Sequence, residues 1–132
     1  ENDEGFTNIH IYKDFATRIY QNKLEFMKML HALKGEGKII WGYGASAKGN
    51  TLMNYFEITN NLIDGIIDDN PKKWGLFTPG SHIKITGIEE LSNKVDFILL
   101  LAWNFGSEII NKCRKAGYTG RFIVPVPVPK II

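Results

Sequence analysis

A glycine-rich turn is the stretch of this chain whose residue types best predict chemistry, with Gly42, Gly44 and Ala47 spaced as Gly-x-Gly-x-x-Ala. It follows an apolar run at residues 39–41 and precedes a segment of helical character. A strand, a tight turn and the first turn of a helix present backbone N–H groups to a phosphate. In such a turn Gly42 permits the bend, Gly44 lets a phosphate approach the backbone, and Ala47 allows close helix packing.

Two charged side chains strengthen the prediction of a phosphate-containing ligand. Asp68 lies 24 residues beyond Gly44, at the predicted end of the second strand. A dinucleotide fold places there a carboxylate that accepts ribose hydroxyls. Lys48 is positioned to neutralise a phosphate. Each feature has a structural alternative, because glycines suit any sharp turn, Asp68 can cap a loop and Lys48 can be a solvated lysine. The turn alone leaves both interpretations open.

Other catalytic motifs do not fit the residues around this turn. Lys48, Gly49 and Asn50 do not form the Gly-Lys-Ser/Thr of an ATP-hydrolysing loop. Lys48 also replaces the second glycine that a nucleophile elbow centred on Ser46 requires. His82 has no partner nearby in the sequence, which favours a structural role over a catalytic or metal-binding one. We therefore predict no catalytic residue and no metal ligand in this chain.

The elements that must position the turn follow from hydrophobic periodicity. Apolar runs alternate with helical patterns, which indicates βαβ units and a parallel sheet. The expected elements are a strand at 39–41, a helix at 47–56, a strand at 62–67, a structured loop at 71–81, a short strand at 83–85, a helical turn at 88–91, a central strand at 95–102, a helix at 105–115 capped by Asn104, and a last strand at 122–124. The predicted fold is a Rossmann-like α/β domain, doubly wound, with a mainly parallel sheet and flanking helices.

The chain of 132 residues is sized for one domain. We expect a loose N-terminal segment at residues 1–8, an amphipathic helix at 9–36 that packs on the sheet, and the α/β core at 37–132. Gly35 and Gly37 should end the helix. The proline-rich tail at 125–129 should run along a surface or an edge, because proline cannot donate a ladder hydrogen bond.

Composition narrows the class of protein further. Hydrophobic residues make up 44% and charged residues 23%, as in soluble globular proteins. A formal charge of +2 without a basic cluster argues against nucleic acid as a partner. Cys113 is the only cysteine, so no internal disulfide can form and a cytoplasmic setting is favoured. No apolar run approaches the roughly 20 residues of a membrane helix. Because the chain begins at Glu1 without a methionine, we expect it to be cut from a longer protein.

Residues that follow the strands should share one crevice, because the carboxyl ends of parallel strands meet at one edge of a sheet. The expected residues there are Tyr43, Ser46, Asp68, Asp69, Trp103 and Asn104. Polar and aromatic groups in such a place are typical of a ligand site. For Trp103 a packing role and stacking on a base or sugar are both open.

Three ordered motifs give the chain a family resemblance. They are GYGASAKGN at residues 42–50, DDNPKKWGLFTPGSHI at 68–83 and LLLAWNF at 99–105. Together they resemble the C-terminal domain of S-adenosylmethionine-dependent sugar C-methyltransferases, over about residues 15–127. These enzymes methylate a ring carbon of nucleotide-linked keto-deoxysugars.

The resemblance implies a three-part enzyme of which this chain is the third part. A cysteine-rich N-terminal segment would bind zinc, and a middle domain would bind S-adenosylmethionine (SAM) and face this domain across the substrate cleft. SAM and zinc are then expected only in those other domains, and the acid–base groups mainly outside this one. The expected partners are a nucleotide-linked deoxysugar and the SAM-binding domain of the same or a partner chain.

The resemblance also implies which residues of this chain would bind substrate. The expected substrate-binding residues include Gly42. The expected diphosphate contacts are Gly44, Ala45, Ser46 and Lys48. The expected cleft-lining residues are Asp68, Asn70, Phe77, Thr78, His82, Trp103 and Asn104.

Three functions follow from these observations. The first is a nucleotide-sugar-binding domain of a sugar C-methyltransferase, inactive or nearly so by itself. The second is an NAD-type dinucleotide-binding domain with Asp68 on the adenosine ribose. The third is a Rossmann module that binds no nucleotide and only completes an interface with its methyltransferase partner.

Overall fold

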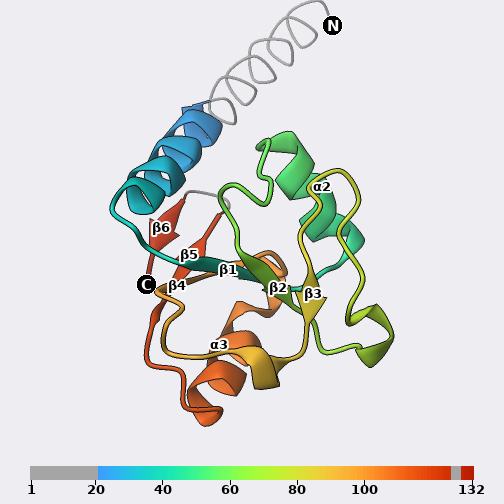
Figure 1. Cartoon of the computed structure of the whole chain (residues 1–132). Helices are drawn as coiled ribbons and strands as arrows, with labels where there is room; N and C mark the ends of the chain where they lie inside the picture. The colour runs from blue at the N-terminus through green and yellow to red at the C-terminus, as the bar shows by residue number, and fades with distance from the viewer. Residues whose placement is uncertain (1–20, 126–128) are drawn as a thin grey trace, which may run out of the picture.

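The computed structural model describes residues 21–125 and 129–132. In this part of the chain the strands form one six-stranded sheet in the order β3-β2-β1-β4-β5-β6 (Figure 1). The strands are β1 (Ile40–Tyr43), β2 (Gly65–Ile67), β3 (Ile85–Thr86), β4 (Phe97–Leu100), β5 (Arg121–Val124) and β6 (Lys130–Ile131). The first five pair in parallel, and β6 is antiparallel to β5. This is the strand order of a Rossmann sheet, whose topological switch lies between β1 and β4. The predicted fold class is confirmed.

Helices cover both faces of the sheet. Residues 21–35 are helical and lie with α2 (Ala47–Tyr55) on one face, while α3 (Gly106–Lys115) lies on the other (Figure 1). Three short 3-10 turns complete the fold, namely η1 (Pro71–Lys73), η2 (Ile88–Glu90) and η3 (Trp103–Phe105). Among the described residues no helix combines the length and apolar character that crossing a bilayer requires.

The two faces carry separate hydrophobic clusters. Phe26 and Leu30 of the first helix are fully buried in the cluster that contains Leu99. Ile109 of α3 packs in the other cluster, which contains Ile98. Neighbouring residues of β4 thus point to opposite faces, as the period of two of a strand requires. Because both faces are covered, β4 is apolar throughout, as expected for a central parallel strand.

The first described helix ends where the sequence predicts. Its last helical residue is Gly35, a turn follows, and Gly37 has a positive φ of 81°. The left-handed conformation is the one that glycine adopts without a steric penalty. Most of the predicted N-terminal part, residues 1–20, and the middle of the proline-rich tail, residues 126–128, lie outside the described residues.

Three details differ from the predicted elements. The second strand begins only at Gly65, because Leu62 and Ile63 are buried in the turn that precedes it. Asn104 does not cap the third helix, since η3 intervenes and α3 begins at Gly106 without a side-chain cap. The sequence analysis also did not predict β6, which pairs with β5 beyond the proline-rich tail.

Gly42 does not make the bend that the motif assigns to it. It lies inside β1, where a Cβ would come within 2.8 Å of Leu101 Cδ1 and 3.2 Å of Ile66 Cγ1. The turn itself is at Gly44, whose φ is 103°. Packing against the neighbouring side chains, rather than backbone bending, therefore requires glycine at position 42.

We predict that Gly42→Ala lowers the free energy of unfolding by about 1–3 kcal/mol, the usual cost of overpacking a filled core. Gly35→Ala is the matched control, because a Cβ there meets no atom within 4 Å. Urea unfolding of the two variants measures the difference. Equal stability of both variants would show that the core at β1 has room for a methyl group.

Candidate functional site

The turn after β1 is held tightly between the two neighbouring strands. The N–H of Gly44 donates to the carbonyl of Ile67 at the end of β2, at 2.8 Å. On the other side, a Cβ on Gly44 would lie 2.8 Å from the Cβ of Ala102, which follows β4. Both the positive φ and the lack of space thus require glycine here.

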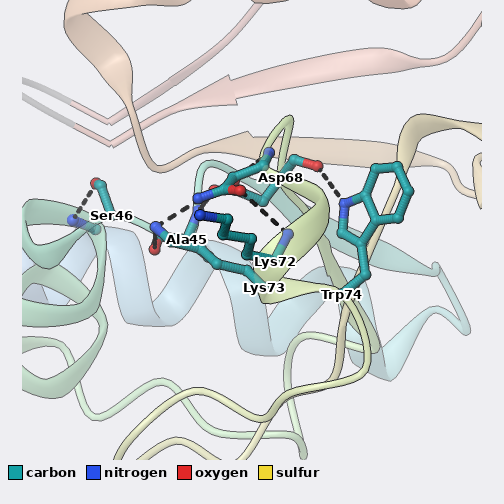
Figure 2. Close-up of polar contacts among 8 residues, drawn as sticks. Ala45, Ser46, Asp68, Lys72, Lys73 and Trp74 are labelled. Atoms are coloured by element: carbon teal, nitrogen blue, oxygen red, sulfur yellow. Dashed lines mark hydrogen bonds and ion pairs between the residues drawn. The ribbon is translucent and has the colours of Figure 1, made fainter.

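Asp68 ties this turn to the loop that follows β2 (Figure 2). Its Oδ2 accepts the N–H of Ala45 at 2.7 Å, and its Oδ1 accepts the N–H of Asn70 at 2.8 Å. Lys73 reinforces the link, because its Nζ donates to the Ala45 carbonyl at 2.8 Å and lies 4.0 Å from Asp68 Oδ2. Trp74 Nε1 donates to the Asp68 carbonyl. The sequence analysis predicts that the Asp68 carboxylate can accept ribose hydroxyls. In the structure both of its oxygens accept hydrogen bonds from the protein itself.

The N-terminus of α2 presents free backbone donors. Ser46 caps the helix, and its Oγ accepts the N–H of Gly49 at 3.1 Å. Within the described residues, the N–H groups of Ser46, Ala47 and Lys48 donate to no protein acceptor. A helix N-terminus with unpaired N–H groups carries a partial positive charge and favours an anion.

Gly49 takes the packing role that the motif assigns to Ala47. A Cβ on Gly49 would lie 2.9 Å from the Gly44 carbonyl oxygen and 3.0 Å from Leu101 Cβ. Ala47 is instead exposed on the first turn of α2. The small residue that lets the helix approach the turn is therefore two positions later than the spacing predicts.

A cavity of about 210 Å³ opens beside this turn, at the carboxyl ends of β1, β2 and β4. Its described lining consists of Tyr43, Gly44, Ser46, Asp68, Asp69, Ala102, Phe105, Glu108, Ile109 and Lys112. The cavity lies at the topological switch between β1 and β4, where open α/β sheets bind ligands. We call it the switch-point cavity.

A hydrogen-bonded row of Tyr43, Asp69 and Lys112 lines the switch-point cavity. The Tyr43 hydroxyl donates to Asp69 Oδ1 at 2.6 Å, and Lys112 Nζ donates to Asp69 Oδ2 at 2.8 Å. Burial, with the Asp69 hydrogen bond, raises the pKa of Tyr43 far above its usual value, so the phenol stays protonated. Burial also raises the pKa of Asp69, but hydrogen bonds from Lys112 and Tyr43 outweigh it and lower that pKa. The row therefore offers charged and neutral hydrogen-bonding groups at neutral pH.

Two further hollows adjoin this region. A cavity of about 280 Å³ includes Trp103 and Asn104 and shares Phe105 and Glu108 with the switch-point cavity. An open groove of about 610 Å³ runs along α2 and includes Lys48 and Trp103. The expected crevice is thus divided. Tyr43, Ser46, Asp68 and Asp69 meet in the switch-point cavity, whereas Trp103 and Asn104 line the neighbouring hollows.

Four of the expected cleft residues lie in the segment after β2 and are not part of the described lining of the switch-point cavity. Asn70 caps η1 through its side chain. Phe77 and His82 stack on each other, with ring centroids 4.6 Å apart. Thr78 is only 4% exposed, and its hydroxyl bonds to Ser81 and accepts the N–H of Ile83. The Thr78 side chain therefore holds a turn and does not face a cleft.

Residues of α3 at the site were missed by the sequence analysis. Glu108 and Lys112 line the switch-point cavity from α3, four positions apart and therefore on one helix face. Lys73 was missed as well, although it contacts the backbone of Ala45. Glu108 and Lys112 are polar, have helical spacing and come soon after the central strand, so the sequence did contain a signal for their role. The sequence alone did not show which face of that helix turns toward the sheet edge.

The fold and the site define a Rossmann-like domain with a glycine turn between β1 and α2, and comparison with known proteins gives its family. The family of C-methyltransferase C-terminal domains matches residues 1–127, and the chain belongs to this family. The chain is similar to the C-methyltransferase NovU of Streptomyces niveus, with 34% identity over 134 aligned positions. The alignment covers 100% of this chain and 32% of NovU, so the chain spans about a third of that relative. The predicted family is confirmed.

We predict that Asp68→Ala lowers the free energy of unfolding by about 2–4 kcal/mol, because hydrogen bonds to a charged group contribute about 1.5–3 kcal/mol each. Asp64→Ala is the matched control, since it removes the surface ion pair of Asp64 with Lys34 and should cost less than about 1 kcal/mol. Chemical denaturation measures both values. A loss at Asp68 no larger than that at Asp64 would contradict its role in fixing the turn.

Proposed function

We propose that this chain is the nucleotide-sugar-binding domain of a SAM-dependent sugar C-methyltransferase. Its ligand is a nucleotide-linked keto-deoxysugar, and the full enzyme methylates a ring carbon of that sugar. The observation that carries this proposal is the set of three free N–H groups, those of Ser46, Ala47 and Lys48, beside the switch between β1 and β4.

The diphosphate of the ligand binds these N–H groups. The N-terminus of α2 contributes positive potential, and the exposed ammonium of Lys48 on its first turn adds a full charge. Asp68 occupies the N–H of Ala45, so the free donors begin one residue later, at Ser46. The diphosphate therefore sits toward α2, away from the Asp68 carboxylate.

The sugar enters the switch-point cavity. Three carboxylates, those of Asp68, Asp69 and Glu108, line the cavity beside the single ammonium of Lys112. This excess of carboxylates disfavours a phosphate, whereas a sugar hydroxyl can donate to a carboxylate and a sugar carbonyl can accept from the Lys112 ammonium. Charge thus orients the ligand, with the diphosphate outside the cavity and the sugar inside it.

Methyl transfer takes place at a partner domain that binds SAM, and zinc also belongs outside this chain. The similarity to a C-methyltransferase about three times as long supports such a division. The phenol of Tyr43 is held protonated and bonded to Asp69, so it serves as a hydrogen-bond donor rather than a base. From the resemblance to sugar C-methyltransferases, we expect the group that removes the proton beside the keto carbon to lie mainly outside this domain.

We predict that thymidine diphosphate, at about one hundred times its Kd, raises the melting temperature by at least about 5 °C, since such binding stabilises by about 2.7 kcal/mol. Lys48→Ala should weaken the affinity about fivefold, the value of an exposed ion pair. Lys94→Ala, which removes an exposed lysine after η2, is the control and should change nothing. Differential scanning fluorimetry with a ligand series measures both effects.

Two results would contradict the proposed function. Stabilisation by NAD but not by thymidine diphosphate would make the chain a dinucleotide-binding domain. No response to any nucleoside diphosphate, together with tight binding to the SAM-binding domain, would make it an interface module only.

A further inference from the structure

The groove along α2 is an apolar surface that the diphosphate and sugar sites leave unused. It has a volume of about 610 Å³ and lies between Trp103 and the α2 face formed by Ala47, Thr51 and Tyr55, which are spaced four apart. This volume is within the range of about 300–1,000 Å³ that small-molecule sites occupy. The groove has the size and the apolar character of a ligand site.

The floor and the walls of the groove differ in burial. Leu52 and Phe56 form the floor and are only 8% and 4% exposed. Tyr55 is 45% exposed, and its ring is held edge-to-face against Phe56 with centroids 5.1 Å apart. Lys23 Nζ lies 5.0 Å from the centroid of the same ring. The exposed aromatic surface is therefore fixed in orientation before any ligand arrives.

The groove is continuous with the diphosphate site. Ala47 and Lys48, which carry two of the three free N–H groups, line one end of it. Tyr55 lies eight residues further along α2, roughly 12 Å at 1.5 Å per residue. A ligand whose diphosphate lies on the N-terminus of α2 can therefore extend an aromatic group along this groove.

We propose that the groove binds the nucleobase and ribose of the nucleotide sugar, with Tyr55 and Trp103 as the aromatic surfaces that contact the base. This inference rests on the proposed function and adds the orientation of the ligand across the N-terminus of α2. The base lies along α2, the diphosphate on residues 46–48 and the sugar in the switch-point cavity. A flat aromatic base suits two aromatic side chains beside an apolar floor, whereas Lys48 and Thr51 are the polar side chains available at the rim.

The test compares thymidine diphosphate with inorganic pyrophosphate, which carries the same anionic group and no base. NMR titrations of the full 132-residue chain measure both affinities, including millimolar ones. The variants are Tyr55→Ala, which removes a ring, and Thr51→Trp, which fills the groove from an exposed position. Leu76→Ala is the control, because Leu76 is an exposed large apolar residue in the segment after β2 and does not line the groove.

We expect Tyr55→Ala to weaken thymidine diphosphate binding by about 5- to 100-fold, the range measured for stacking of one base on an aromatic side chain. Thr51→Trp should weaken it as well, and neither variant should change pyrophosphate binding. Leu76→Ala should leave the binding of both ligands unchanged. Melting curves confirm that each variant is folded.

The outcomes separate this inference from the function on which it rests. Unchanged thymidine diphosphate affinity in both groove variants would overturn the base site while leaving the diphosphate site intact. An equal loss for both ligands would also overturn it. If neither ligand binds the wild-type chain, the proposed function fails first.

Discussion

The carboxylate of Asp68 fixes the position of the turn on which the site depends. It engages the N–H of Ala45 from the end of β2, and Lys73 holds the carbonyl of the same residue. Gly44 is confined between the ends of β2 and β4. These contacts satisfy the backbone up to Ala45, and among the described residues the next donors along the chain, at the start of α2, have no protein acceptor. A turn that is fixed before ligand binding avoids the entropic cost of ordering it.

The charges around the turn are divided between its two sides. The side toward α3 carries three carboxylates, those of Asp68, Asp69 and Glu108, and the Lys112 ammonium that pairs with Asp69. The side toward α2 has backbone donors, the Lys48 ammonium and an apolar groove. Under the proposed function, such a division would favour one direction of nucleotide-sugar binding, because each of the three chemical parts of the ligand would meet a surface of matching polarity.

Much of the sheet could be predicted from sequence because burial on both faces leaves a strong apolar signal. The apolar run before Ala102 predicted the central strand, β4. The spacing from Gly44 to Asp68 predicted that the ends of two strands lie close together. What failed was the assignment of roles within short motifs. Gly42 is required by the side chain of Leu101, and Gly49 by the carbonyl of Gly44. Both requirements come from residues distant in sequence or from a backbone path that local spacing does not specify.

Sequence analysis could predict the site residues only at the carboxyl ends of the strands. Tyr43 ends β1 and Asp69 comes shortly after β2, and both were expected there, whereas Glu108 and Lys112 reach the cavity through the orientation of α3. Thr78 was expected in the cleft on motif position, but packing of the loop placed it in the interior. Helix orientation and loop packing are tertiary effects, so sequence periodicity does not determine them.

A crystal structure of the chain with thymidine diphosphate tests the central claim most directly, because it shows which backbone donors contact the phosphates. The account predicts phosphate oxygens at about 2.7–3.2 Å from the N–H groups of Ser46, Ala47 and Lys48, with the Asp68 to Ala45 hydrogen bond retained. Phosphates bound elsewhere on the domain, or a turn that opens and releases Asp68 to the ribose, would contradict it.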